Sequence, residues 1–320
     1  MTIAISGSLA FDRIMTFPER FADHILPDKL HILNVCFLVD SMEERFGGTA
    51  GNIAYNLCLL GEKPVIHGVL GKDGQRYMDR LKELGLPLDM IRTIEDEHTA
   101  GAFITTDKAD NQITGFNPGA MRRRMERDPK TGPDDLGIIS PGNADDMVGH
   151  AEVFRDRGTP FVFDPGQQIP ALGGEGLSRG MEGAAVFIAN DYELEMTMQA
   201  TGLDMDGMLG KCRSVVTTLG DQGCRVHTAG ADPVEVPALP VLDAQDPTGA
   251  GDAFRAGLLK GLAEGRPLEE ACGLGAAVAA YCVERRGTQE HVFTPEDILE
   301  RARGAYGPPA WAGALGAMVA

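Results

Sequence analysis

The chain has 320 residues, which suggests about two structural units or one large α/β domain with an insertion. Apolar residues make up 43% and charged residues 24%, so disorder over most of the length is excluded. The formal charge is −18, from 29 Lys and Arg against 47 Asp and Glu, and it argues against nucleic acid or an anionic membrane as main partner. A small phosphate-bearing ligand stays compatible, because backbone N–H groups can bind phosphate in an acidic protein.

No stretch approaches the roughly 18 consecutive apolar residues that a membrane span needs. The sequence has no basic residue before Arg13 and no cleavage-site pattern, so we expect a cytoplasmic protein. The six cysteines include no C-x-x-C pair, and most lie in apolar segments. We therefore expect buried free thiols rather than a disulfide framework or a zinc site.

Short apolar runs alternate with helical patterns along most of the chain. Strands are expected at residues 3–6, 64–70, 137–140, 160–163, 184–189 and 214–219, and several of these runs are apolar throughout. Helical patterns between them include residues 52–60, 75–84, 145–155 and 203–211. This alternation predicts an α/β fold with a doubly wound, mostly parallel sheet and helices on both faces.

The pattern changes toward the C-terminus. Residues 224–228 and 234–236 flank a turn and predict an antiparallel hairpin. Helices are expected at residues 249–263 and 268–283, and a third begins after Thr294 with Pro295 at its first position.

Two regions depart from this rhythm. Residues 21–45 are mixed, and residues 100–116 alternate like edge strands around a polar turn. We interpret both as parts of a small β-sheet lid. The expected organisation is a single domain over residues 1–320, with the lid formed by insertions at about 13–46 and 99–120.

The strongest chemical signal is the sequence D-P-T-G-A-G-D at residues 246–252. Gly249, Ala250 and Gly251 open a helix, where successive N–H groups and the helix dipole can hold an anion. Asp252 lies beside them and can accept a proton from an attacking hydroxyl while those N–H groups stabilise a transferring phosphoryl group. The alternative is a glycine-rich helix start whose Asp is favoured by the dipole.

This segment resembles the C-terminal signature of the ribokinase-like PfkB family of sugar and nucleoside kinases. A second signature, G-G-T-A-G-N at residues 47–52, lies near the N-terminus and leads into a helix. The resemblance runs over nearly the whole chain. It implies a ribokinase-like fold and an ATP-dependent phosphotransferase that acts on an alcohol.

The resemblance also implies how the substrate is held. Asp12, with Ser8 close by after the first strand, corresponds to the family's aspartate that binds sugar hydroxyls, and a carboxylate suits a vicinal diol. Gly48 and Asn52 match the family's sugar-contacting pair; Gly permits close backbone approach. The alternative for Asp12 is a turn residue, and we favour the functional interpretation. For Asn52 the alternative is a residue that starts a helix, which would be preferred if Asn52 were considered alone.

Further matches concern ATP and metal ions. Asn190 and Glu193 resemble the family's N-x-x-E motif, in which Mg²⁺ is organised near the phosphates through waters; a helix cap is the alternative. Residues that the resemblance places at ATP are Asn190, Thr218, Gly220, Gly223, Gly249, Gly251, Arg255 and Gln289. Thr218, Gly220 and Gly223 can also form a plain turn. Arg255 can reach a phosphate or be a surface charge. Asp246 would lie near a monovalent cation, since many members are activated by K⁺.

Within the family, the chain is most similar to bacterial adenosine kinases and broad-specificity nucleoside kinases. Phe116 on the expected lid can stack on a nucleobase or pack within the lid. Adenosine-selective members carry an aromatic residue in place of Ala102 and an Arg in place of Ala171, so a roomier base pocket is expected. We therefore expect a nucleoside kinase of purine salvage that takes adenosine and also inosine, guanosine or cytidine.

Three alternatives stay open. A ribokinase- or phosphofructokinase-type sugar kinase would share every catalytic residue and differ in the lid. A nucleotide sensor without kinase activity is disfavoured by Asp252 and its glycines. A dehydrogenase is disfavoured because no G-x-G-x-x-G follows the first strand. Exposed lid strands invite pairing between subunits, and similar kinases dimerise there, so a homodimer through the lid is expected.

Overall fold

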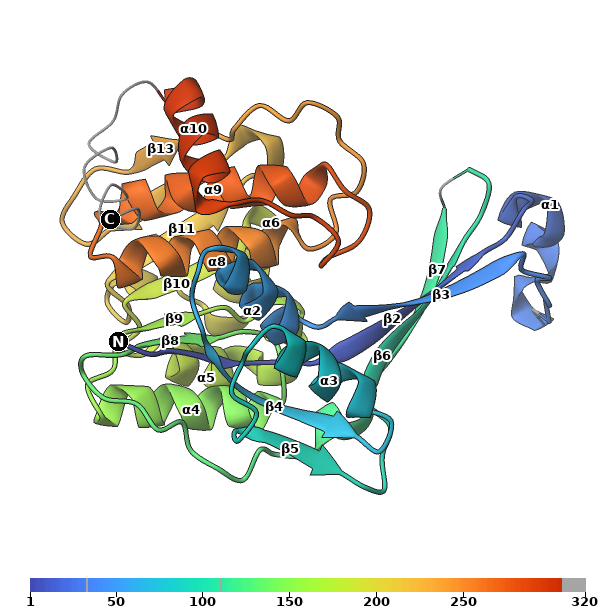
Figure 1. Ribbon diagram of the computed structural model, residues 1–320, viewed down its shortest axis with the longest axis horizontal. Coiled ribbons are helices and arrows are strands. Elements are labelled where there is room, and N and C mark those ends of the chain that lie inside the picture. The colour runs from blue at the N-terminus through green and yellow to red at the C-terminus, as the bar shows by residue number, and fades with distance from the viewer. Residues whose placement is uncertain (33, 110, 307–320) are drawn as a thin grey trace.

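The computed structural model describes residues 1–32, 34–109 and 111–306. Its main body is a nine-stranded sheet in the order β13-β12-β11-β10-β9-β8-β1-β4-β5 (Figure 1). The strands from β5 to β11 run parallel to their neighbours, and β12 and β13 add an antiparallel edge. They span Ile3–Ser6 (β1), Val65–Gly71 (β4), Ile91–Ile94 (β5), Leu136–Ile139 (β8), Phe161–Phe163 (β9), Val186–Asn190 (β10), Ser214–Thr218 (β11), Cys224–Thr228 (β12) and Val234–Val236 (β13).

Helices cover both faces of this sheet, and each face has its own apolar core. One core joins the sheet to Thr49–Leu59 (α2), Gln75–Glu83 (α3), Ala250–Ala263 (α8), Leu268–Val283 (α9) and Pro295–Tyr306 (α10). The other joins it to Ala144–Asp156 (α4), Ile169–Met181 (α5), Asp191–Thr201 (α6) and Met205–Leu209 (α7). The expected α/β architecture is confirmed. The expected strands and the named helices are present, with ends that differ by up to three residues.

A second sheet of four strands extends away from the body (Figure 1). Its order is β3-β2-β6-β7, from Ser41–Gly47 (β3), Ala10–Thr16 (β2), Ala100–Thr106 (β6) and Gln112–Asn117 (β7). We call this sheet the lid. Between β2 and β3 the chain forms the short helices Phe21–His24 (α1) and Pro27–Ile32 (η1) at the far end of the lid. These strands overlap the segments expected for the lid, 13–46 and 99–120, although β2 begins before the first of them and β3 ends one residue after it.

One face of the lid is joined to α3 by an ion-pair bridge. Glu44 on β3 pairs with Arg13 on β2 at 2.9 Å and with Arg76 on α3 at 2.8 Å. Arg13 also lies 3.7 Å from Asp73, just before α3, and its guanidinium stacks on the ring of Phe103. The lid is therefore held to the body by charge as well as by the strands that connect the two.

Four of the six cysteines are buried, as expected, while Cys58 is half-buried and Cys36 is exposed on the chain between η1 and β3. Among the described residues, no helix has the length and apolar character that crossing a bilayer requires.

Candidate active site

A cavity of about 1100 Å³ lies between the carboxyl ends of the parallel strands and the lid. This is where α/β sheets commonly bind ligands, because the loops that follow parallel strands converge there. Most of the site residues expected from the sequence line it: Ser8, Asp12, Gly48, Asn52, Phe116, Asn190, Glu193, Thr218, Gly220, Gly223, Gly249, Ala250, Gly251, Asp252 and Arg255. Asp246 and Gln289 are not among its lining residues.

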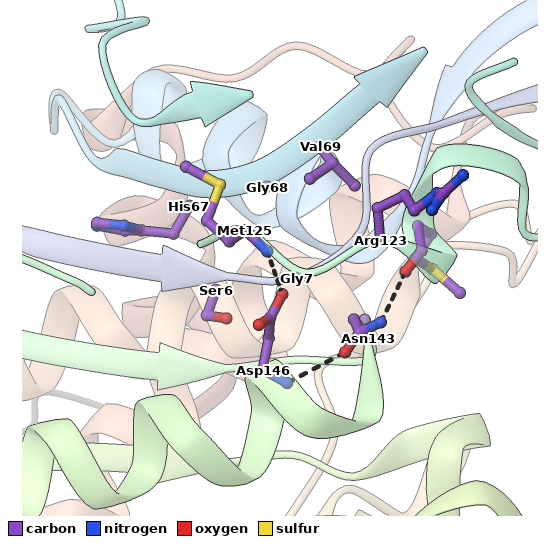
Figure 2. Close-up of a pocket in the computed structure, with 11 residues that line it drawn as sticks. Ser6, Gly7, His67, Gly68, Val69, Arg123, Met125, Asn143 and Asp146 are labelled. Atoms are coloured by element: carbon purple, nitrogen blue, oxygen red, sulfur yellow. Dashed lines mark hydrogen bonds between the residues drawn. The ribbon is translucent and has the colours of Figure 1, made fainter. Parts of the chain in front are cut away.

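A second cavity, of about 20 Å³, lies between β1, β4 and the start of α4 (Figure 2). Two of its polar side chains are already engaged: the Asn143 side chain caps α4, and the Asp146 carboxylate accepts the Met125 N–H at 2.7 Å. A space of this size holds about one water molecule. This small cavity therefore has no room for a substrate, unlike the large cavity.

The first turn of α8 forms one wall of the large cavity. Gly249 caps the helix at a φ of +83°, a left-handed conformation that glycine adopts most readily, and a Cβ there would lie 2.9 Å from Thr288 Cγ2. N–H groups of a first helical turn lack carbonyl partners within the helix. Ala250 is an exception here, because its N–H donates to the Pro247 carbonyl at 3.1 Å. Of the three expected anion donors, one is thus already engaged.

Asp252 is half-buried in this turn and is held by a residue from α2. Asn52 Nδ2 donates to Asp252 Oδ2 at 2.9 Å, although the two residues are 200 positions apart in the sequence. Burial raises the pKa of Asp252 to about 7, and the Asn52 hydrogen bond and the Arg255 charge oppose that rise. A carboxyl group with a pKa near neutrality is well matched to general-base catalysis.

Asp12 lies on the lid face that borders the cavity. In the strand register it stands beside Ala102 on β6, which in turn stands opposite Phe116 on β7, and all three line the cavity. Burial raises the pKa of Asp12 to about 6, while Arg45, its neighbour on β3, lowers it. Phe103 follows Ala102 and projects to the other face, as strand alternation predicts.

Phe116 is half exposed at the cavity rather than packed inside the lid. Ser8 also lines the cavity, and its hydroxyl accepts the Thr49 N–H at 3.1 Å, at the start of α2. The carboxylate, the hydroxyl and the aromatic ring thus border one space.

Asn190 and Glu193 form a capping box at the start of α6. The Asn190 side chain accepts the Glu193 N–H at 2.8 Å, and the Glu193 carboxylate accepts the Asn190 N–H at 2.9 Å. Both residues also line the cavity. No cluster of three or more His, Cys, Asp or Glu suited to a metal ion occurs in the described part of the chain. Mg²⁺ held mainly by phosphates and waters needs only one or two carboxylates, and Glu193 is compatible with that role.

Two expected ATP contacts have other partners in the structure. Arg255 is buried instead of being a surface charge: its guanidinium pairs with Asp164 and also donates to the Gly251 carbonyl at 3.0 Å. Gln289 is buried behind the cavity, where its Nε2 donates to Asn52 Oδ1 at 3.0 Å. Neither side chain is free in the way that the sequence pattern suggested.

Asp246 also lies outside the cavity wall. Its carboxylate accepts the N–H groups of Thr248 at 2.9 Å and Gly287 at 3.0 Å, so it ties the loop before α8 to the loop after α9.

Sequence reasoning missed Asp164 and Gln167 as cavity residues. Asp164 directly follows β9, so its place at the carboxyl end of a parallel strand was the available signal. Ala171, expected to touch a base, is exposed on α5 and is not among the cavity-lining residues. Ala171 lies on the solvent side of this helical turn, while Ile169 and Leu172 of the same turn are buried.

Comparison with known proteins assigns this architecture to a family. Residues 11–295 match the model of the pfkB family carbohydrate kinases. The curated nucleoside kinase of Methanocaldococcus jannaschii is 31% identical over 272 residues, which are 84% of this chain and 89% of that protein. The nucleoside kinase of Methanothermobacter thermautotrophicus is 28% identical, over 95% of this chain and 96% of its own.

Solved structures agree with the sequence comparison. The Burkholderia thailandensis nucleoside kinase in complex with inosine has a TM-score of 0.83 and 37% identity, covering 96% of this chain and 98% of that one. The M. jannaschii nucleoside kinase has a TM-score of 0.85 and 28% identity, covering 95% and 99%. The chain therefore belongs to the pfkB family of carbohydrate kinases and has the ribokinase-like fold. It is a phosphotransferase.

Proposed function

We propose that the protein is an ATP-dependent nucleoside kinase, which transfers the γ-phosphoryl group of ATP to the 5′-hydroxyl of a ribonucleoside. One observation supports this proposal most directly. Asp12, Ala102 and Phe116 form one row across the lid, facing the cavity that Asp252 also lines. The row offers a carboxylate for a ribose diol and an aromatic ring for a base. Nucleoside kinases among its relatives, including one solved with inosine, support the same substrate class.

In the proposed reaction, Asp252 accepts the proton of the 5′-hydroxyl as that oxygen bonds to the γ-phosphorus. The bond from the γ-phosphorus to the bridging oxygen breaks, and ADP leaves with its electron pair. The first-turn N–H groups of α8 stabilise the charge on the transferring group. Asp12 and Asn52 hold the diol, with Ser8 and Gly48 beside them.

The remaining ATP residues belong to the same proposal. Asn190, Thr218, Gly220 and Gly223 line the part of the cavity nearest β10 and β11, so we assign the nucleotide there. The charge of Arg255 is paired with Asp164, so we assign Arg255 an indirect role at the phosphates: it positions Gly251 by donating to the Gly251 carbonyl. Mg²⁺ would be held by the phosphates and, through water, by Glu193. A K⁺ ion would lie by the two loops that Asp246 joins, where backbone carbonyls are available.

Base selectivity is proposed to be broad. Ala102 leaves space opposite Phe116, so adenosine, inosine, guanosine and cytidine should all be accepted. Activity of this kind would serve purine salvage in the cytoplasm. A homodimer through the lid is part of the proposal, because β7 is exposed along its length and Leu26, Ile32 and Leu38 are exposed at the far end of the lid.

The test is ADP release with MgATP and adenosine, inosine, guanosine, cytidine, ribose or fructose 6-phosphate, each with and without K⁺. Turnover with nucleosides and not with sugars is expected. Turnover with ribose or fructose 6-phosphate alone would replace the nucleoside assignment by the sugar-kinase alternative and leave the role of Asp252 in place. Sedimentation of the purified protein tests the dimer.

A further inference from the structure

Behind Asp252 lies a chain of buried hydrogen bonds that ends at Tyr77 on α3. The Tyr77 hydroxyl donates to the Gly47 carbonyl at 2.7 Å. Gln289 Nε2 donates to the Tyr77 oxygen at 3.2 Å and to Asn52 Oδ1 at 3.0 Å. Asn52 Nδ2 then donates to Asp252 Oδ2 at 2.9 Å. Tyr77, Gln289 and Asn52 are all buried, so water does not substitute for these partners.

The direction of each bond in this chain is determined by the one before it. Because Tyr77 gives its single proton to Gly47, its oxygen can only accept from Gln289. Gln289 must therefore turn its amide nitrogen toward both Tyr77 and Asn52. Since that nitrogen donates to Asn52 Oδ1, Asn52 is left with its nitrogen toward Asp252.

The orientation of Asn52 selects the charge state of Asp252. An amide nitrogen donates to a carboxylate, whereas an amide oxygen would accept from a protonated carboxyl group. If Asn52 flipped, its nitrogen would face the nitrogen of Gln289, and two donors would be opposed. The protonated form of Asp252 therefore lacks the acceptor, the amide oxygen of Asn52, that a freely rotating Asn52 side chain would offer it.

We infer that Gln289 is a positioning residue that favours the ionised form of Asp252 by fixing the amide orientation of Asn52. This assigns Gln289 a role distinct from ATP contact, and it rests on the proposed function only through the role of Asp252 as base. Other groups that act on the Asp252 charge come from several elements: Arg255 on α8, Asp164 after β9, Asp12 on β2, Tyr77 on α3 and Cys282 on α9. Of these groups, Tyr77 alone influences the orientation of Asn52, and it does so indirectly, by accepting a hydrogen bond from Gln289.

The test replaces Gln289 by methionine, which has a similar length and no donor. Loss of one net hydrogen bond corresponds to a rise of roughly half to one unit in the pKa of Asp252. The pKa is read directly from the carbon-13 NMR titration of the aspartate carboxyl groups, with the Asp252 signal assigned by its loss in Asp252→Asn. This measurement needs no turnover, so it separates failure of the inference from failure of the kinase proposal.

The pH profile of kcat gives the second readout. In Gln289→Met the fall of kcat on the acidic side of the profile should shift to higher pH. Its kcat should therefore be about two- to fivefold lower than that of the wild type at pH 7 and recover above about pH 9. Ser214→Ala is the matched control, because it removes a buried hydroxyl that bonds Thr228 far from the cavity. Ser214→Ala should lower the stability of the protein and leave unchanged both the pKa of Asp252 and the acidic limb of the kcat profile.

An unshifted Asp252 pKa in Gln289→Met would overturn the inference, and so would a loss of kcat that is equal at every pH. If Gln289→Met does not fold, Tyr77→Phe takes its place. It removes the acceptor that holds the Gln289 nitrogen, and the same upward direction is expected. An unchanged pKa in that variant would equally overturn the inference.

Discussion

Phe116 is paired with Ala102 in the antiparallel register of β7 and β6, so an aromatic ring and a methyl group lie side by side on the lid face that borders the cavity. We predict that Ala102→Phe narrows the base pocket. The ratio of kcat/KM for guanosine to that for adenosine should fall about tenfold, because guanine carries exocyclic groups at both C2 and C6 whereas adenine carries one at C6 alone. Phe103→Ala, on the other face of the same strand, is the matched control and should leave the ratio unchanged. An unaltered ratio in Ala102→Phe would show that the base binds elsewhere.

Asp12 should govern nucleoside binding more than the chemical step. In Asp12→Ala the KM for the nucleoside should rise by about one to two orders of magnitude, the equivalent of a lost charged hydrogen bond, while kcat changes little. Since the pKa of Asp12 is raised to about 6, the KM of the wild-type protein should also increase as the pH falls below 6. Asp12→Asn should lose that pH dependence, and its persistence would refute the diol role.

Asp252→Asn tests the base. The amide keeps an oxygen for the Asn52 hydrogen bond but cannot accept a proton at neutral pH. We expect kcat to fall by at least about a hundredfold with nucleoside KM nearly unchanged. Single-turnover phosphorylation, followed by product separation, measures the step itself. A kcat close to that of the wild type would assign the proton transfer to another group.

The same variant should be more stable than the wild type. Asp252 has a folded-state pKa near 7 and an unfolded-state value near 4. Between these values the folded protein retains the proton and the unfolded chain releases it, so rising pH removes stability. Thermal unfolding should therefore give a Tm advantage for Asp252→Asn that is small at pH 4, grows up to about pH 7 and is then constant. An advantage independent of pH would contradict the raised pKa.

The ion-pair bridge at Glu44 should influence how the lid closes. In Glu44→Gln the pairs with Arg13 and Arg76 weaken, and each exposed pair contributes little. We expect the nucleoside KM to rise roughly two- to tenfold, with the difference from wild type shrinking in high salt because charges are then screened. Glu235→Gln removes a surface pair with Arg225 on β12 and should have no effect.

Much of the fold was predictable because local signals agreed with tertiary packing. The first strand, Ile3–Ser6, is fully buried and apolar except for Ser6, and the hairpin of β12 and β13 is marked by its turn. Helix α5 was not picked out, since Gly173, with a φ of +59°, kinks it and further glycines weaken its helical signal. Its burial against the sheet, which the sequence pattern does not report, holds it helical.

Motifs were enough to predict which residues gather at the large cavity, with few exceptions, but they did not predict the hydrogen-bond partners of those residues. Asn52 and Asp252 lie in two recognisable motifs, yet nothing in either motif says that they bond to each other. Gln289 and Arg255 were assigned to ATP by their position near those motifs. Their actual partners, Asn52 and Asp164, are distant in sequence and are brought to them only by the packing of α2 and β9.

The lid begins only three residues after the central strand β1 ends, because residues 7–9 alone separate Ser6 from Ala10. Asp12 is therefore near the pivot of any lid rotation, whereas α1 and η1 lie at the far end of the arm. A small rotation would move the tip of the lid through a long arc and leave the Asp12 carboxylate almost in place. The proposed contact between Asp12 and the ribose diol could therefore form before the lid closes and persist while the tip moves over the substrate.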